Sequence, residues 1–210
     1  MLDQTANSCG CPEAIYAREL SHRANNALQG ALAAMHLGRR GGAGLDYAVQ
    51  RLEGVIALNR ALGPDRAGVV ETEKVIRQVC AAVVKAAGSE DVDVIVSADT
   101  IWAESHRVRP LLMVIAELVG NAISHAFPEG AGTVLVSLRD SGRSARLVVE
   151  DDGICGGWDR PGGQGRGIVD AFAAHLGGRV RRGITSGGSS RIVVILPTIA
   201  LVAYCSEGRA

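Results

Sequence analysis

The apolar residues of this 210-residue chain change their spacing at Gly63-Pro64. Before that point they recur every three or four positions, first over 17–35 and again over 45–62, which predicts two amphipathic helices. The glycine-rich segment 38–44 predicts a short connection that makes the two helices antiparallel. One hairpin cannot cover both apolar seams, so the pattern predicts a four-helix bundle formed by two copies of the chain.

Beyond Pro64, helical and strand spacings are mixed without strict alternation. Helical spacing predicts helices at 72–87, from Pro110 to about 127, and from about 167 to 176. Period-two alternation predicts strands at 91–97, 133–139, 144–150, 179–184 and 190–196. Asp140-Ser141-Gly142 is a hairpin signal. The expected fold class is therefore α+β, a helical hairpin followed by an α/β sandwich with its helices on one face.

The charges balance, with 22 Lys plus Arg and 22 Asp plus Glu, so we expect no nucleic-acid or membrane partner. The N-terminus has no basic and apolar leader, and the most apolar stretch, 192–204, contains Pro197. That stretch is shorter than the roughly 18–20 residues of a membrane span. The five cysteines lack paired zinc-ligand spacing, which favours reduced thiols in a cytoplasmic protein.

His22 lies opposite the apolar seam of the first predicted helix, on the side of Asn25 and Asn26. An exposed, neutral imidazole is a competent nucleophile, although position alone does not separate His22 from His36. Glu19, one turn earlier, has two equally weighted interpretations. It either orients the imidazole or forms a surface pair with Arg23.

A second group of polar residues interrupts the apolar segment 110–127. Glu117, Asn121, Ser124 and His125 recur at helical spacing and so share one helix face. An asparagine oxygen on that face can coordinate Mg²⁺, which prefers hard oxygen ligands. Four polar residues at one angular position favour a functional site over a buried structural helix.

Two further segments have the composition of binding turns. Asp151 follows the predicted strand 144–150, where a carboxylate can accept a hydrogen bond from an exocyclic amine, although such turns are common. The segment Gly163-Gln164-Gly165-Arg166-Gly167 leads into the last predicted helix. Closely spaced glycines at a helix start let backbone N–H groups approach a phosphate. Each pattern is weak when taken alone.

In this order, the segments resemble a known family. Residues 19–29 are similar to the phosphoacceptor box of sensor histidine kinases of the class in which Arg follows the His. Segments 117–128, 148–156 and 163–167 resemble the N, G1 and G2 boxes of the Bergerat-type ATPase domain, and 187–197 resembles its closing turn and strand. The resemblance implies three parts: a dimerisation and phosphotransfer hairpin (1–65), an ATP-binding catalytic domain (66–200) and a tail (201–210).

The resemblance also implies roles for individual residues. ATP and Mg²⁺ would lie between the N-box helix and the glycine loops, with Asp151 on the adenine amine and Asn121 on the metal. Glu117 would orient the metal or its waters. The residues expected to line the phosphates are His125, Gly153, Gly163, Gly165 and Gly167.

The implied function is that of a homodimeric histidine kinase core. His22 would attack the γ-phosphoryl group of ATP and pass it to an aspartate on the receiver domain of a response regulator. Asn26 would position a water for dephosphorylation of that regulator. A separate sensor protein is a further expected partner, since the resemblance leaves no sensor domain within these residues.

Two alternatives stay open. Cys155 stands where the G1 box usually has glycine, and the loop between Asp151 and Gly163 is short for an ATP lid. These departures fit an ATP-independent histidine phosphotransferase that relays phosphate through His22. A Ser/Thr kinase of the anti-sigma type would use the nucleotide site without His22, and it leaves the helical hairpin without a purpose.

Overall fold

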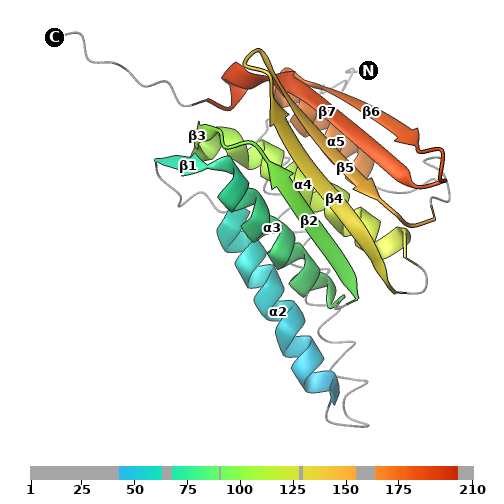
Figure 1. The fold of residues 1–210 in the computed structure, drawn as a ribbon. Coiled ribbons are helices and arrows are strands. Elements are labelled where there is room, and N and C mark those ends of the chain that lie inside the picture. The colour runs from blue at the N-terminus through green and yellow to red at the C-terminus, as the bar shows by residue number, and fades with distance from the viewer. Residues whose placement is uncertain (1–42, 63–67, 90, 128–129, 155–163, 203–210) are drawn as a thin grey trace, which may run out of the picture.

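A computed structural model describes residues 43–62, 68–89, 91–127, 130–154 and 164–202. Its elements, in chain order, are α2 (Ala43–Leu62), β1 (Val69–Glu71), α3 (Thr72–Ala87), β2 (Val92–Ala98), β3 (Trp102–Glu104), α4 (Ser105–His125), β4 (Gly132–Asp140), β5 (Ser144–Asp151), α5 (Gln164–His175), β6 (Arg179–Ile184), β7 (Ser190–Pro197) and the short 3-10 helix η1 (Thr198–Ala200) (Figure 1). The first predicted hairpin helix lies outside the described residues. Four predicted site residues also do: Glu19, His22, Asn26 and Gly163.

The larger sheet has five strands in the order β2-β4-β5-β7-β6. β2 runs parallel to β4, and every other neighbouring pair is antiparallel. The β4–β5 hairpin turns at the predicted place, where Asp140 Oδ1 accepts a hydrogen bond of 2.9 Å from the N–H of Gly142. Gly142 has a φ of 79°, which glycine adopts without steric cost. The five strands predicted from the sequence are confirmed within one residue at each end.

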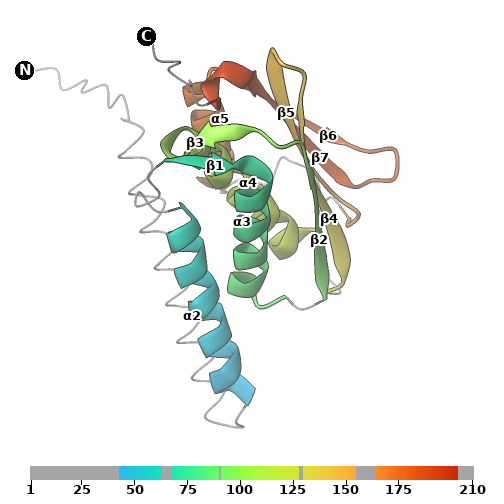
Figure 2. The ribbon, with the colours of Figure 1, turned by 60° about the vertical axis from the view of Figure 1, so that its left-hand side comes forward.

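Helices α3, α4 and α5 cover one face of this sheet, and α2 packs on the outer side of α3 (Figure 2). The core lies between sheet and helices, where Val134, Val136 and Leu138 of β4 are fully buried. This is the mixed α+β fold expected from the sequence. Within the described ranges, no helix combines the length and the apolar character needed to cross a membrane.

Cys80 belongs to the core through the buried face of α3. It is a free cysteine, and burial raises the pKa of its thiol to about 12, against a smaller opposite effect of the Arg77 charge. The thiol is therefore protonated and unreactive at neutral pH.

The prediction that Pro110 opens a helix is wrong, because α4 begins five residues earlier at Ser105. Strands β1 and β3 form a two-stranded antiparallel ribbon that the sequence patterns did not reveal. Beside this ribbon, the N–H of Ser105 donates a 3.0 Å hydrogen bond to the carbonyl of Gly68, which fixes the helix start. Pro110 then lies inside the helix, at the cost of one backbone hydrogen bond.

The start of the last helix also differs from the prediction. α5 begins at Gln164 rather than near Gly167, so Gly165 and Gly167 lie in its first turn instead of in a preceding loop. The glycines favoured a loop in the sequence because each costs helix stability. The buried residues Val169, Phe172 and Ala173 anchor the helix in the core, where tertiary packing outweighs that local cost.

Helix α2 has apolar residues on two opposite faces. The sequence pattern revealed one of these faces. Gly54, Leu58 and Ala61 are buried on the side that packs against α3. Val49 and Ile56, which belong to the predicted hairpin seam, lie on the other side and are 46% and 50% exposed. The four-helix bundle stays a prediction, because the residues that would cover this seam lie outside the described part of the chain.

Substituting Gly54 by alanine should destabilise the fold. A Cβ at this position would lie 2.3 Å from the backbone nitrogen of Ala86, so α2 and α3 would have to separate. We expect a loss of about 1–3 kcal/mol in the free energy of unfolding, measured by denaturant titration.

Gly120→Ala is the matched control, since Gly120 is also inside a helix and a Cβ there would have only Val83 Cγ1 within 4 Å, at 3.9 Å. It should gain up to about 1 kcal/mol from helix propensity. If both variants were equally stable, the close contact between α2 and α3 would be wrong.

The chain continues to pack beyond its last strand. Thr198 in η1 donates from Oγ1 to Asp140 Oδ1 at 2.6 Å, and Leu201 is fully buried. Val202 forms an isolated antiparallel bridge with Ala103 of β3. The buried core therefore reaches Leu201, the first residue of the predicted tail.

Candidate functional site

The predicted polar face of α4 lies where neither the sheet nor the other helices bury the helix. Among residues 111–127, those that are not buried are Glu117, Gly120, Asn121, Ser124 and His125. Glu117 and Asn121 are half-buried, whereas Ser124 and His125 are exposed. Glu117 precedes His125 by about 12 Å along the helix axis, at 1.5 Å per residue. The face thus forms a polar stripe that leads to the C-terminal end of α4.

Asp151 ends β5 and is buried, at 6% exposure. Its Oδ1 accepts two backbone hydrogen bonds, from Gly153 at 3.2 Å and from Ser190 at 3.3 Å. These two donors fix the orientation of the carboxylate. Among the described residues, no recorded hydrogen bond reaches the other oxygen, Oδ2, which leaves an acceptor for a ligand.

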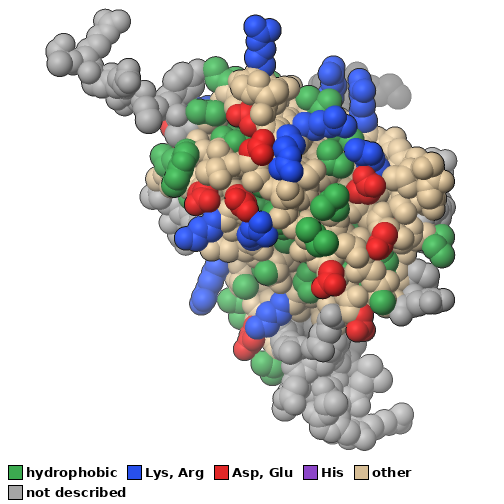
Figure 3. Space-filling view, in the orientation of Figure 1, with side chains coloured by type: hydrophobic (Ala, Val, Ile, Leu, Met, Phe, Trp, Pro, Cys, Tyr) green, Lys and Arg blue, Asp and Glu red, His purple; other side chains and the backbone are tan. Residues whose placement is uncertain are grey.

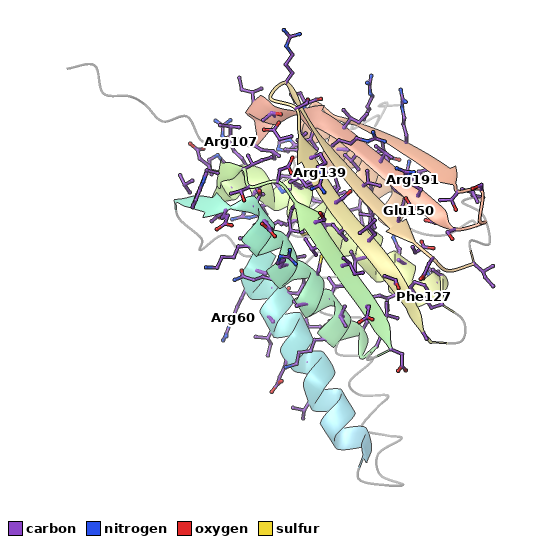
Figure 4. The ribbon with its side chains drawn as sticks, in the orientation of Figure 1. Arg60, Arg107, Phe127, Arg139, Glu150 and Arg191 are labelled. Carbon is purple, nitrogen blue, oxygen red and sulfur yellow. The ribbon has the colours of Figure 1, made fainter. Side chains whose placement is uncertain are left out.

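Gly153 joins this carboxylate to the end of α4. The next residue, Ile154, donates a 3.0 Å backbone hydrogen bond to the carbonyl of Ala126, which follows His125. A Cβ on Gly153 would lie 2.3 Å from that carbonyl oxygen, so only glycine fits. The turn after β5 is therefore attached directly to the end of the polar stripe, close to Phe127 in Figure 4.

Asp152, beside Asp151, has a structural contact of its own. Its Oδ1 accepts a 2.7 Å hydrogen bond from the N–H of Thr133, and its own N–H donates to the Thr133 carbonyl at 3.1 Å. The two neighbouring carboxylates therefore differ, since Asp152 closes the β4–β5 pairing while Asp151 is directed into the interior.

Helix α5 begins at the same end of the sandwich. Its last turn lies beside the start of β6, where the N–H of Gly178 donates to the carbonyl of Ala173 at 2.8 Å. β6 starts opposite Ile195, near the end of β7, whereas Ser190 at the start of β7 contacts Asp151. The opposite, N-terminal end of α5 therefore lies toward Asp151 (Figure 1), and this first turn contains Gly165 and Gly167. A helix N-terminus with unpaired N–H groups favours an anion.

The structure thus brings together most of the described residues that the sequence singled out. His125, Asp151, Gly153, Gly165 and Gly167 lie at one end of the sandwich, and Asn121 and Glu117 follow along α4. Sequence reasoning missed the role of Ser190 as a donor to Asp151. The glycine-rich turn 187–190 marked this segment in the sequence. No local pattern reveals its contact with Asp151, which lies 39 positions earlier.

Comparison with known proteins finds sequence similarity to sensor histidine kinases. It is 32% identical over 147 residues to the sensor histidine kinase PdtaS of Mycobacterium tuberculosis, a match that covers 65% of this chain and 29% of that protein. It is 30% identical over 196 residues to blue-light-activated histidine kinase 2 of Erythrobacter litoralis, which covers 84% of this chain and 55% of that protein. The chain thus spans about half, or less, of the length of these relatives. No family model matches it.

Solved structures share the fold. The histidine kinase domain of the Erythrobacter litoralis EL346 blue-light-activated kinase superposes with a TM-score of 0.57 at 22% identity, covering 88% of this chain and 94% of that domain. A bacterial phosphotransferase superposes with a TM-score of 0.59 at 13% identity, covering 87% of this chain and 94% of that protein. The sequence relatives of the chain are thus sensor histidine kinases, and its fold is that of a solved histidine kinase domain.

Proposed function

We propose that the chain binds ATP with Mg²⁺ at this end of the sandwich and transfers the γ-phosphoryl group to His22. The observation that carries the proposal is the convergence of three features: the buried carboxylate of Asp151, the polar stripe of α4 and the start of α5. The relatives named above, both histidine kinases, support the same activity.

The adenine would be recognised by Asp151. Its Oδ2 is an acceptor in a buried position, and the exocyclic amine of adenine is a donor. The backbone donors on Oδ1 hold the carboxylate in place before the base arrives, which lowers the cost of ordering the site.

The donor set on α4 fits a magnesium ion that arrives with a triphosphate. The described residues contain no group of three or more His, Cys, Asp or Glu side chains that could hold a metal ion. Mg²⁺ needs no such group, because it keeps several waters and binds through phosphates and one or two protein oxygens. Asn121 would supply one oxygen and Glu117 would orient the ion or its waters. When bound, the ion neutralises charge on the phosphates.

The phosphates would lie between the end of α4 and the start of α5. The exposed ring of His125 and the backbone at Gly153 would line one side. Gly165 and Gly167 at the helix start, with Gly163 before them, would supply N–H groups on the other. Phosphoryl transfer needs mainly positioning and charge stabilisation, and both would come from these groups.

The phosphoryl group would pass through His22 to a receiver-domain aspartate of a response regulator. The imidazole would attack phosphorus in line as the bond to the leaving ADP breaks, while Glu19 would hold the ring. Asn26 would position a water that hydrolyses the phosphoaspartate of the regulator. Val49 and Ile56, exposed on α2, support the homodimer in which two hairpins form a bundle.

The second candidate is a histidine phosphotransferase that relays phosphate through His22 without ATP. The departure at Cys155 favours it, since this residue replaces a glycine of the resembled G1 box. One variant distinguishes the two candidate functions. If Cys155→Gly creates nucleotide binding that the native chain lacks, the relay is correct.

Replacing Asn121 by alanine tests the kinase proposal. The variant should bind a fluorescent ATP analogue at least about tenfold more weakly in the presence of Mg²⁺, because the ion loses a protein oxygen. With EDTA in place of Mg²⁺, native chain and variant should bind the analogue equally weakly. Fluorescence anisotropy measures both affinities.

Ser124→Ala is the matched control, because Ser124 lies on the same stripe without an assigned role. Its Mg²⁺-dependent affinity should equal that of the native chain. Equal affinities for Asn121→Ala and the native chain would remove Asn121 from the metal site.

A further inference from the structure

The sheet face opposite the helices is uncovered in the described part of the chain. Helices α3, α4 and α5 all lie on the other side (Figure 2). Alternate residues of each strand therefore point away from the core, including Ile95 and Leu135, which are 53% and 39% exposed. This open face lies outside the proposed nucleotide site, and the inference drawn from it goes beyond the proposed function.

Four arginines occupy the part of the open face nearest the β4–β5 hairpin, and we call them the arginine cluster. Arg139 of β4 is directly opposite Arg146 of β5, Arg146 is opposite Ile195 of β7, and Ile195 is opposite Arg179 of β6. The next row contains Val148, Val193 and Arg181 in the same strand order. Figure 3 shows basic side chains gathered over this region, with hydrophobic ones among them.

The charges of this cluster are incompletely compensated. Arg139 forms an ion pair with Asp99 at 3.4 Å and donates a hydrogen bond to Ser97. Within the described part of the chain, Arg146, Arg179 and Arg181 form no ion pair. The carboxylate of Glu150 on the same face is paired with Arg191 at 3.2 Å (Figure 4). Like charges directly opposite each other on a sheet are destabilising, so the position of Arg146 opposite Arg139 does not stabilise the fold.

Apolar side chains lie between the arginines. Val148 is buried, and Val193 and Ile195 are half-buried on the same face. Protein interfaces have this composition, with an apolar centre and arginines that bind carboxylates through two parallel hydrogen bonds. Nucleic acid would require phosphate contacts throughout, and the balanced charge of the whole chain gives no general attraction to it.

We propose that the arginine cluster binds an acidic segment of a partner protein, with carboxylates on either side of an aliphatic residue. Arg146 and Arg179 are two strand spacings apart, about 10 Å. Residues three apart in a segment with polyproline II conformation lie on the same side and span about 9 Å, which places a carboxylate near each arginine and leaves the intervening aliphatic residue beside Ile195. Charge complementarity thus selects the partner, and the apolar centre selects a protein over a membrane surface or DNA.

A peptide probe tests this assignment on the full chain. The probe is a fluorescein-labelled peptide of repeated Glu-Leu-Thr-Glu units. The variants are the double substitution Arg146→Gln with Arg179→Gln and the control Arg60→Gln with Arg77→Gln. The control arginines are exposed on α2 and α3, away from the open face. We expect the first double variant to bind the probe at least about tenfold more weakly, and the control to bind it as the native chain does.

The unfolding temperature provides a second readout. Arg146→Gln should leave it unchanged or raise it, because the substitution removes a like-charge neighbour of Arg139. Absence of probe binding to the native chain, or equal binding by the two double variants, would overturn the proposal. Tighter binding of a DNA duplex or of phosphatidylglycerol vesicles through the same arginines would overturn the choice of partner.

Discussion

Asp151→Asn is expected to weaken ATP binding by a factor of about 100 or more while leaving the fold intact. Asparagine has the same shape, and its carbonyl oxygen can still accept the backbone hydrogen bonds from Gly153 and Ser190. Its amide nitrogen then takes the place of Oδ2 and directs a donor at the donor amine of adenine. A buried polar contact that loses its partner costs far more than a surface contact.

The same substitution should change the preferred base. Inosine triphosphate has a carbonyl oxygen in place of the adenine amine, so the asparagine variant should bind it more tightly than ATP, and the native chain should do the reverse. Asp152→Asn is the matched control, since Asp152 contacts Thr133 and not the proposed adenine site. Calorimetric titration of the native chain, the variant and the control with both nucleotides gives six affinities. An unchanged ATP affinity in Asp151→Asn would place the base elsewhere.

His22→Gln should abolish transfer of labelled phosphate from ATP to the chain while ATP affinity stays within about twofold of the native value. The glutamine side chain is polar and of similar length but has no imidazole nitrogen to attack phosphorus. The proposed nucleotide site lies on α4, β5 and α5, and the proposal gives His22 no part in binding the nucleotide. Acid-labile, base-stable label measured after gel separation reports the transfer.

His36→Gln is the control for this assay, because His36 is another histidine of the same predicted helix but lacks the surrounding phosphoacceptor box. It should be labelled as the native chain is. Label that survives in His22→Gln and disappears in His36→Gln would move the acceptor to His36.

The parts of the fold that the sequence predicted well are those controlled by local spacing. The helix 72–87 and the five strands of the large sheet follow from periodicity, because each has one face against the core. The β1–β3 ribbon could not be predicted from periodicity, because its strands have three residues each and are about 30 positions apart in the chain. Missing that ribbon led directly to the wrong start for α4, because the helix begins where β3 ends.

The candidate site shows the same division. Local patterns identified residues on single elements, such as Asn121 on the polar stripe and Asp151 at the end of a predicted strand. The contacts that join those elements, from Ile154 to Ala126 and from Ser190 to Asp151, depend on tertiary packing and left no local pattern. For α2, periodicity identified the Val49 and Ile56 face and missed the opposite face, which is buried only because α3 lies beside Gly54.

The central claim is that this chain phosphorylates its own histidine from ATP, and labelling of the native 210-residue chain tests it most directly. The chain is incubated with γ-labelled ATP and Mg²⁺, with EDTA in a parallel sample, and with a labelled, phosphorylated receiver domain in a third. The account predicts acid-labile label from ATP that EDTA abolishes. Label acquired from the receiver domain but never from ATP would contradict it and assign the chain to the ATP-independent relay.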